Sequence, residues 1–131
     1  MYKKIAIDTY NGEKLEVEFL ANAATPRRYK QIFGDDLLQK FVDAEKEEDG
    51  RTIYDIDFLQ ELAFVMAMQA KAKSDDKVKL EKLNQNNFMD WLEDFDSMAI
   101  EENAVEIMNV YMKNAKTSSD AKKNIEEQSE K

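Results

Sequence analysis

The chain contains neither cysteine nor histidine, and its 131 residues include one proline and three glycines. Without cysteine it can form no disulfide bond and no thiolate metal site, and without histidine it lacks the commonest general base and metal ligand. Ser-His, Cys-His and zinc-hydrolase arrangements are therefore excluded. The glycines, at positions 12, 34 and 50, are too far apart for a phosphate-binding loop.

The acidic charge and the short apolar runs narrow the class of protein further. The 28 acidic and 19 basic residues give a net charge of -9, which disfavours binding to nucleic acid or to an anionic membrane. The longest apolar stretch, from Leu62 to Ala70 and interrupted only by Gln69, is too short to span a bilayer. The first residues lead into a strand pattern rather than a signal peptide. We therefore expect a cytoplasmic protein.

The N-terminal segment has the pattern of a β-hairpin over residues 3–20. Ile5 and Ile7 alternate with polar residues, as do Leu15, Val17 and Phe19 further along. Between the two runs lie Asn11 and Gly12, which both tolerate the positive φ of a type I′ turn, so the sequence predicts a two-residue turn there. A two-stranded ribbon is not stable alone, and helices must cover its apolar face.

The first helices are predicted from their capping residues. Thr25-Pro26 predicts a helix start in which the threonine oxygen accepts from amides of the first turn, and Gly34 can close that helix. Asp35 or Asp36 can start a second helix, with the apolar residues Leu37, Leu38, Phe41 and Val42.

A charged loop is expected at residues 45–51, and Thr52 with Asp55 predicts a capping box and a helix from about residue 53. Apolar residues surround that helix on all sides between residues 56 and 70, so we expect it to be central. Lysines and aspartates over residues 71–82 then predict the end of this helix followed by an exposed connection.

Two more helices complete the predicted fold. Asn86 or Asn87 can cap a fourth helix, whose apolar stripe is Phe88, Trp91, Leu92 and Phe95, and a fifth carries Ile100, Ala104, Ile107, Met108 and Tyr111. The polar residues 115–131 predict a disordered tail or a frayed helix. The sequence therefore predicts one α+β, mainly helical domain over residues 1–114, in which a hairpin packs on about five helices within residues 26–114. The predicted core is Ile5, Ile7, Val17, Phe19, Ile32, Phe33, Leu38, Leu59, Leu62, Met66, Trp91, Leu92, Phe95, Ile107 and Tyr111.

Acidic pairs are the candidates for a metal or acid-base site. They occur at Asp35-Asp36, Asp55/Asp57, Asp75-Asp76 and Asp94/Asp96. Aspartate is common at helix starts, and none of these groups has the alternating layout of a calcium loop. We therefore interpret them as caps and solvated faces, and predict no catalytic residue, metal or cofactor.

Every methionine except Met1 lies in the C-terminal half, on three predicted helices. Methionine adapts its shape, so such residues can form a groove for a partner, although helix-period methionines usually face inward. Trp91 and its aromatic neighbours are open to the same two interpretations, core or interface anchor. The candidate partner-binding residues are Met66, Met68, Trp91, Met108 and Met112.

Several short segments follow one another in a particular order. Asn11-Gly-Glu13 lies between the strands, followed by Ala21-Asn-Ala-Ala24 and Phe33-Gly-Asp-Asp-Leu-Leu38, then by an alanine- and methionine-rich helix and Phe88-Met-Asp-Trp-Leu-Glu-Asp-Phe95. Over about residues 3–114 this order resembles the tail assembly chaperones of long-tailed (siphovirus-type) phages and prophages of Gram-positive bacteria. No single segment is specific; the resemblance depends on their order and on the length of the chain.

The resemblance implies a non-enzymatic protein of the host cytoplasm that is absent from the mature virion. Such a protein binds the tape measure protein, keeps it soluble and helps tail tube subunits assemble around it. The family also implies a frameshifted longer form that recruits the tail tube protein, and Lys122-Lys123 is where a slippery adenine run could encode the shift. The chain itself leaves open whether it forms a homo-oligomer.

Two other classes of function compete with this one. The net charge favours an acidic module that mimics DNA and inhibits a nucleic-acid enzyme, but lysine and arginine interrupt the acidic residues almost everywhere. A carboxylate-dependent enzyme would require a cleft with at least two converging acids of perturbed pKa.

Overall fold

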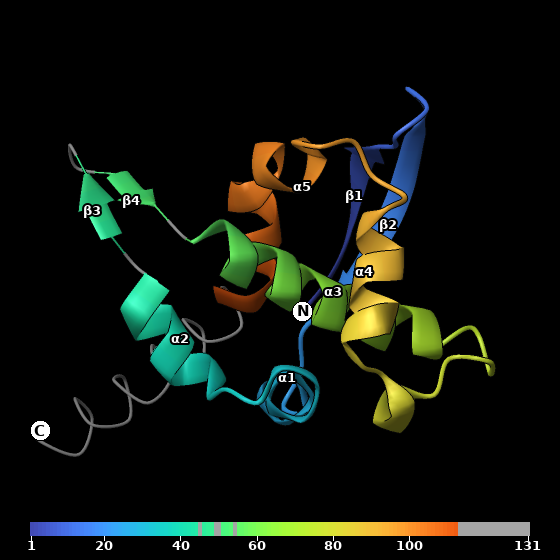
Figure 1. Ribbon diagram of the computed structural model, residues 1–131, viewed down its shortest axis with the longest axis horizontal. Coiled ribbons are helices and arrows are strands. Elements are labelled where there is room, and N and C mark those ends of the chain that lie inside the picture. The colour runs from blue at the N-terminus through green and yellow to red at the C-terminus, as the bar shows by residue number, and fades with distance from the viewer. Residues whose placement is uncertain (45, 49–50, 54, 113–131) are drawn as a thin grey trace, which may run out of the picture.

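The computed structural model describes residues 1–44, 46–48, 51–53 and 55–112. Its elements run in the order β1 (Tyr2–Asp8), β2 (Lys14–Leu20), α1 (Thr25–Phe33), α2 (Leu37–Ala44), β3 (Lys46–Glu48), β4 (Arg51–Ile53), α3 (Ile56–Ala72), the 3-10 helix η1 (Leu80–Lys82), α4 (Gln85–Leu92) and α5 (Ala99–Glu102) (Figure 1). Residues 104–112 are also helical. The α+β, mainly helical fold with an N-terminal hairpin is confirmed.

The hairpin packs its predicted apolar face on α3. Strands β1 and β2 are antiparallel, with Ile5 opposite Val17 and Ile7 opposite Leu15. Ile5, Ile7, Val17 and Phe19 are all buried, whereas the alternate positions face outward. Burying this face against the helix is the main stabilisation of a two-stranded sheet that would be marginal alone.

The turn of the hairpin has three residues, so the predicted two-residue type I′ turn is wrong. The Thr9 amide donates to the Glu13 carbonyl oxygen at 2.7 Å, and the Gly12 amide donates to the Thr9 carbonyl oxygen at 3.1 Å. Gly12 has a φ of 84° and supplies the left-handed residue that closes such a loop. A two-residue turn would pair Tyr10 with Glu13, but the Tyr10 amide donates to the carbonyl oxygen of Asp94 instead.

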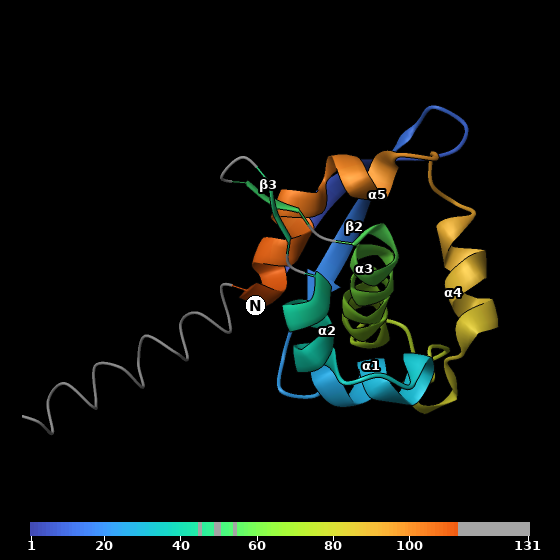
Figure 2. The same cartoon turned by 60° about the vertical axis from the view of Figure 1, so that its left-hand side comes forward.

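Helix α3 is the central helix, as predicted. Residues 62–70 are buried without interruption, and β2, α1, α4 and α5 lie around them (Figure 2). The helix begins at Ile56 because Asp55 is its N-cap and accepts from the amides of Asp57 and Phe58. The predicted Thr52–Asp55 capping box is therefore wrong. A charged loop was predicted for residues 45–51, but β3 and β4 form a short antiparallel pair in and just after this segment.

Helix α1 begins at Thr25 as predicted, but the threonine is not its cap. The hydroxyl oxygen of Thr25 instead accepts from the amide of Asn22 at 3.0 Å and from the side chain of Gln69 at 2.8 Å. Gly34 ends the helix with a φ of 82°, and its amide donates to the carbonyl oxygen of Lys30. Thr25 is fully buried, which explains why its oxygen serves a tertiary contact rather than the helix end.

Helix α2 turns a different leucine inward from the one predicted. Asp36 caps the helix through the amide of Gln39, so Leu37 and Phe41, four positions apart, face the core. Leu38 is 63 % exposed, and its predicted place in the core is wrong. Phe33, Trp91 and Leu92 are half-buried, and the other predicted core residues are buried.

Helix α4 begins earlier than predicted. Asn84 is the N-cap, and its side chain and that of Asn87 accept from each other's backbone amides at 3.1 and 3.0 Å. Asn87 is therefore the third residue of a capping box rather than the cap. In the described part of the chain, no helix is long and apolar enough to cross a membrane. Residues 113–131, including the predicted tail, lie outside the described residues.

Candidate partner-binding groove

The five candidate partner-binding residues do not form one exposed cluster. Met66 and Met108 are fully buried core residues, so for them the core interpretation is correct and direct partner contact is ruled out in this conformation. Met112, the last described residue of the helical segment 104–112, is 36 % exposed. Met68, a core residue that is 9 % exposed, and the half-buried Trp91 remain, and both line a surface groove.

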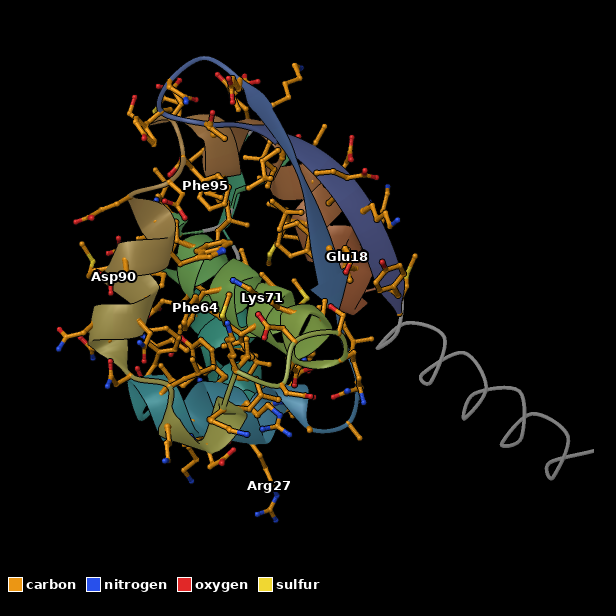
Figure 3. The ribbon with its side chains drawn as sticks, turned by 90° about the vertical axis from the view of Figure 1, so that its right-hand side faces the viewer. Glu18, Arg27, Phe64, Lys71, Asp90 and Phe95 are labelled. Atoms are coloured by element: carbon orange, nitrogen blue, oxygen red, sulfur yellow. The ribbon has the colours of Figure 1, made fainter. Side chains whose placement is uncertain are left out.

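The groove lies between β2 and α4, with α3 as its floor (Figure 3). Its first section has a volume of about 330 Å³. It is lined by Leu15, Glu16, Val17 and Glu18 of β2, by Ala67, Met68 and Lys71 of α3, by Trp91, Asp94 and Phe95, and by Lys4 and Ser74. The structure thus brings together one face of the predicted aromatic stripe and the methionine-rich helix.

The second section continues the groove toward the connection between α3 and α4. It has a volume of about 480 Å³ and shares Met68, Lys71, Trp91 and Asp94 with the first. Val78 and Leu83 add apolar surface on this side. A chain segment that lies along the groove would therefore contact both sections.

Aromatic packing holds the wall of the groove in place. The ring of Trp91 lies 4.8 Å from that of Phe95 and 5.7 Å from that of Phe64, measured between centroids. Phe64 in turn contacts Phe88, one turn before Trp91 on α4. Trp91 is half-buried, so it presents a fixed apolar surface at little cost in conformational entropy on binding.

The β2 strand borders the groove with an edge whose backbone groups are unpaired. Met1 and Ala21 exchange two hydrogen bonds at one end of the hairpin, and Thr9 bonds Glu13 at the other. Hydrogen-bonded pairs alternate in an antiparallel ladder, so the backbone groups of the odd-numbered residues of β2 bond to β1. The backbone N–H and C=O groups of the even-numbered residues point away from β1. Within the described residues, the backbone groups of Glu16 and Glu18 have no hydrogen-bond partner.

The Gln69 side chain ends this open edge. Its Nε2 donates to the carbonyl oxygen of Leu20 at 2.8 Å, which is the even-numbered residue at the end of β2. On the outer face of the sheet the carboxylate of Glu18 lies 3.9 Å from Lys4 Nζ. A hydrogen bond with Glu18 also raises the pKa of Tyr2 to about 12. Lys4 and Glu18 both line the first section, so this ion pair lies at the margin of the groove, while the backbone groups of Glu18 stay open.

Lysines dominate the rim of the second section, although the chain as a whole is acidic. Lys71, Lys77, Lys79 and Lys82 line it, against Asp90 and Asp94. Among the described residues, none of these four lysines lies within 4.0 Å of a carboxylate. The rim therefore carries positive charge that a partner can neutralise. The sequence identified these lysines as an exposed connection but could not show that they border a groove.

A second, acidic depression lies away from the groove. Asp43, Asp55, Asp57 and Glu61 line it together with Lys40, in a volume of about 160 Å³. Burial raises the pKa of Glu61, and the Tyr29 hydroxyl, which donates to Glu61 at 3.1 Å, opposes that shift. Within the described ranges, no three acidic residues are arranged to hold a metal ion.

Comparison with protein-family models, with curated proteins and with solved structures found no match for this chain. The function proposed below therefore depends on the sequence resemblance and on the groove.

Proposed function

We propose that this protein is a phage tail assembly chaperone that binds the tape measure protein and keeps it soluble during tail morphogenesis. It acts without enzymatic chemistry in the cytoplasm of the bacterial host and is not part of the mature virion. A longer frameshifted form would recruit the tail tube protein. The observation that supports a binding role is the groove, in which Met68 and the half-buried Trp91 lie beside an open strand edge.

The groove has the properties that a protein needs to hold an aggregation-prone client. It offers apolar side chains of adaptable shape, and the methionine on its floor can accommodate different partner residues. The net charge of -9 gives the complex a repulsive surface that opposes aggregation. The client would occupy the groove in the complex.

The test is co-expression of the full chain with the tape measure protein encoded nearby. We expect the tape measure protein to move from the insoluble to the soluble fraction and to copurify with the chain. If its solubility does not change, the proposed function is wrong.

Two matched variants locate the contact. Leu15 lines the groove and is 46 % exposed, so Leu15→Glu should leave the fold intact and lower the soluble yield of the client. Met89 is 53 % exposed on α4 but is not part of the groove lining, so Met89→Glu should leave the yield unchanged. Equal effects of the two variants would place the client elsewhere.

A further inference from the structure

The open edge of β2 indicates how the groove holds its client. We propose that a segment of the client binds as an added β-strand along residues 14–18, with alternate apolar side chains directed at Met68 and Trp91. Acidic residues of the same segment then contact the lysines of the rim. This inference rests on the proposed function and specifies the conformation and charge of the bound segment.

The unpaired backbone groups favour an extended segment over a helix. Glu16 and Glu18 each present an N–H and a carbonyl oxygen toward the groove side of β2. A helix laid against them would bury these groups without partners, since its own backbone groups are already bonded internally. An extended segment can pair with them and continue the ladder, because a strand adds to a free edge through its main chain.

The walls of the groove favour a single strand over a folded copy of the chain. The edge of β2 faces Trp91, Asp94 and Phe95 across the first section. An added strand lies about 4.8 Å from its neighbour, so it can occupy the space beside β2. A second copy carries α4 beside its own β2 edge as well, so its β2 edge is less accessible for pairing than an extended segment.

The charge of the rim predicts the composition of the part of the segment that extends past the paired strand. Lys71, Lys77, Lys79 and Lys82 have no carboxylate partner among the described residues, so they attract negative charge. Apolar residues at every second position, followed by aspartates or glutamates, would be complementary to both sections of the groove.

The experiment uses the full chain in its complex with the tape measure protein. Hydrogen exchange measured by NMR should show the amides of Glu16 and Glu18 protected at least about tenfold in the complex relative to the free chain. The Val17 amide bonds to β1 in both states and serves as the internal control.

A proline variant tests the same edge independently. Glu16→Pro removes an N–H that points away from β1, so the hairpin is preserved, and we expect about a tenfold weaker complex. Glu16→Gln keeps the N–H and controls for the charge. Ala6→Pro places the same change on the other strand, where the amide of an even-numbered residue also points outward, and should bind normally.

The outcomes separate the two proposals. If the wild-type chain forms no complex with the tape measure protein, both are wrong. If a complex forms but the amides of Glu16 and Glu18 exchange as fast as before, or if Glu16→Pro retains the client, this inference alone is wrong. If Glu16→Pro fails to fold, exchange in the wild-type complex decides the matter.

Discussion

The side-chain amide of Gln69 donates to the hydroxyl oxygen of Thr25 at 2.8 Å, inside the core. The same nitrogen reaches the Leu20 carbonyl oxygen, so one buried side chain of α3 ties together β2 and the start of α1. Replacing Gln69 with leucine leaves the Leu20 carbonyl oxygen without this donor and leaves the Thr25 oxygen with the Asn22 amide alone. We expect the free energy of unfolding to fall by about 1–3 kcal/mol, measured by urea denaturation.

A double variant of Gln69 and Thr25 tests whether the hydrogen bond between them accounts for the loss of stability. Thr25→Val removes the acceptor at nearly constant volume and should also destabilise the fold. Because both changes break one interaction, their combination should cost less than the sum of the single effects. Strict additivity would show that Gln69 and Thr25 act independently.

The lysine rim predicts a salt-dependent interaction with the client. Lys79→Glu reverses one charge on the rim, so the complex should weaken several-fold at low salt and less at high salt. Lys73→Glu makes the same change on the same connection at a residue that does not line the groove, and should have little effect. Equal losses would indicate that only the overall charge matters.

The buried methionines predict effects on stability rather than on binding. Met66 is fully buried in α3, so Met66→Ala should lower the free energy of unfolding by about 2–5 kcal/mol. Met89→Ala, at an exposed position, should change it by less than about 0.5 kcal/mol. Thermal denaturation followed by circular dichroism measures both. Similar effects of the two substitutions would contradict the burial of Met66.

Glu61 predicts a pH dependence of stability. Burial raises its pKa above the ordinary value of 4.5, so the folded state binds its proton more tightly than the unfolded state. The contribution of the protonated carboxyl to the free energy of unfolding is complete below pH 4.5. It is lost as the pH rises through the folded-state pKa of Glu61. Glu61→Gln stays neutral and keeps an acceptor for Tyr29, so it should be more stable than the wild type at pH 7.

That gain should disappear near pH 4, where the wild-type carboxyl is also protonated. Denaturant midpoints measured between pH 4 and pH 8 test this. Glu93→Gln removes one charge at an exposed position and controls for the change in net charge. A Glu61→Gln gain that does not depend on pH would contradict the assignment.

The fold could be predicted from the sequence where local signals act alone. Alternation at Ile5, Ile7, Val17 and Phe19 identified the buried face of the hairpin, and the continuous apolar residues of α3 identified the central helix. The errors fall where tertiary contacts compete with local ones. Thr25 bonds Gln69 instead of capping α1, for example. No local pattern predicts a partner 44 residues away.

The candidate site was predicted less completely, because helical periodicity does not distinguish a core face from an interface face. Met66 and Met68 are two residues apart on α3, yet Met66 is enclosed and Met68 borders the groove. The lysine rim depends on the path of the connection between α3 and α4, which composition does not determine. The open edge of β2 required knowledge of which residues pair with β1.

The two edges of the hairpin differ, and the difference limits how the molecules can associate. Phe95 forms a bridge with Thr9, and the Asp96 amide donates to the Asp8 carbonyl oxygen, so the chain itself closes β1 at its turn end. The edge of β2 instead borders the groove, with α4 on its far side. A covered edge does not pair with the edge of another molecule, so this end of β1 is protected against edge-to-edge aggregation.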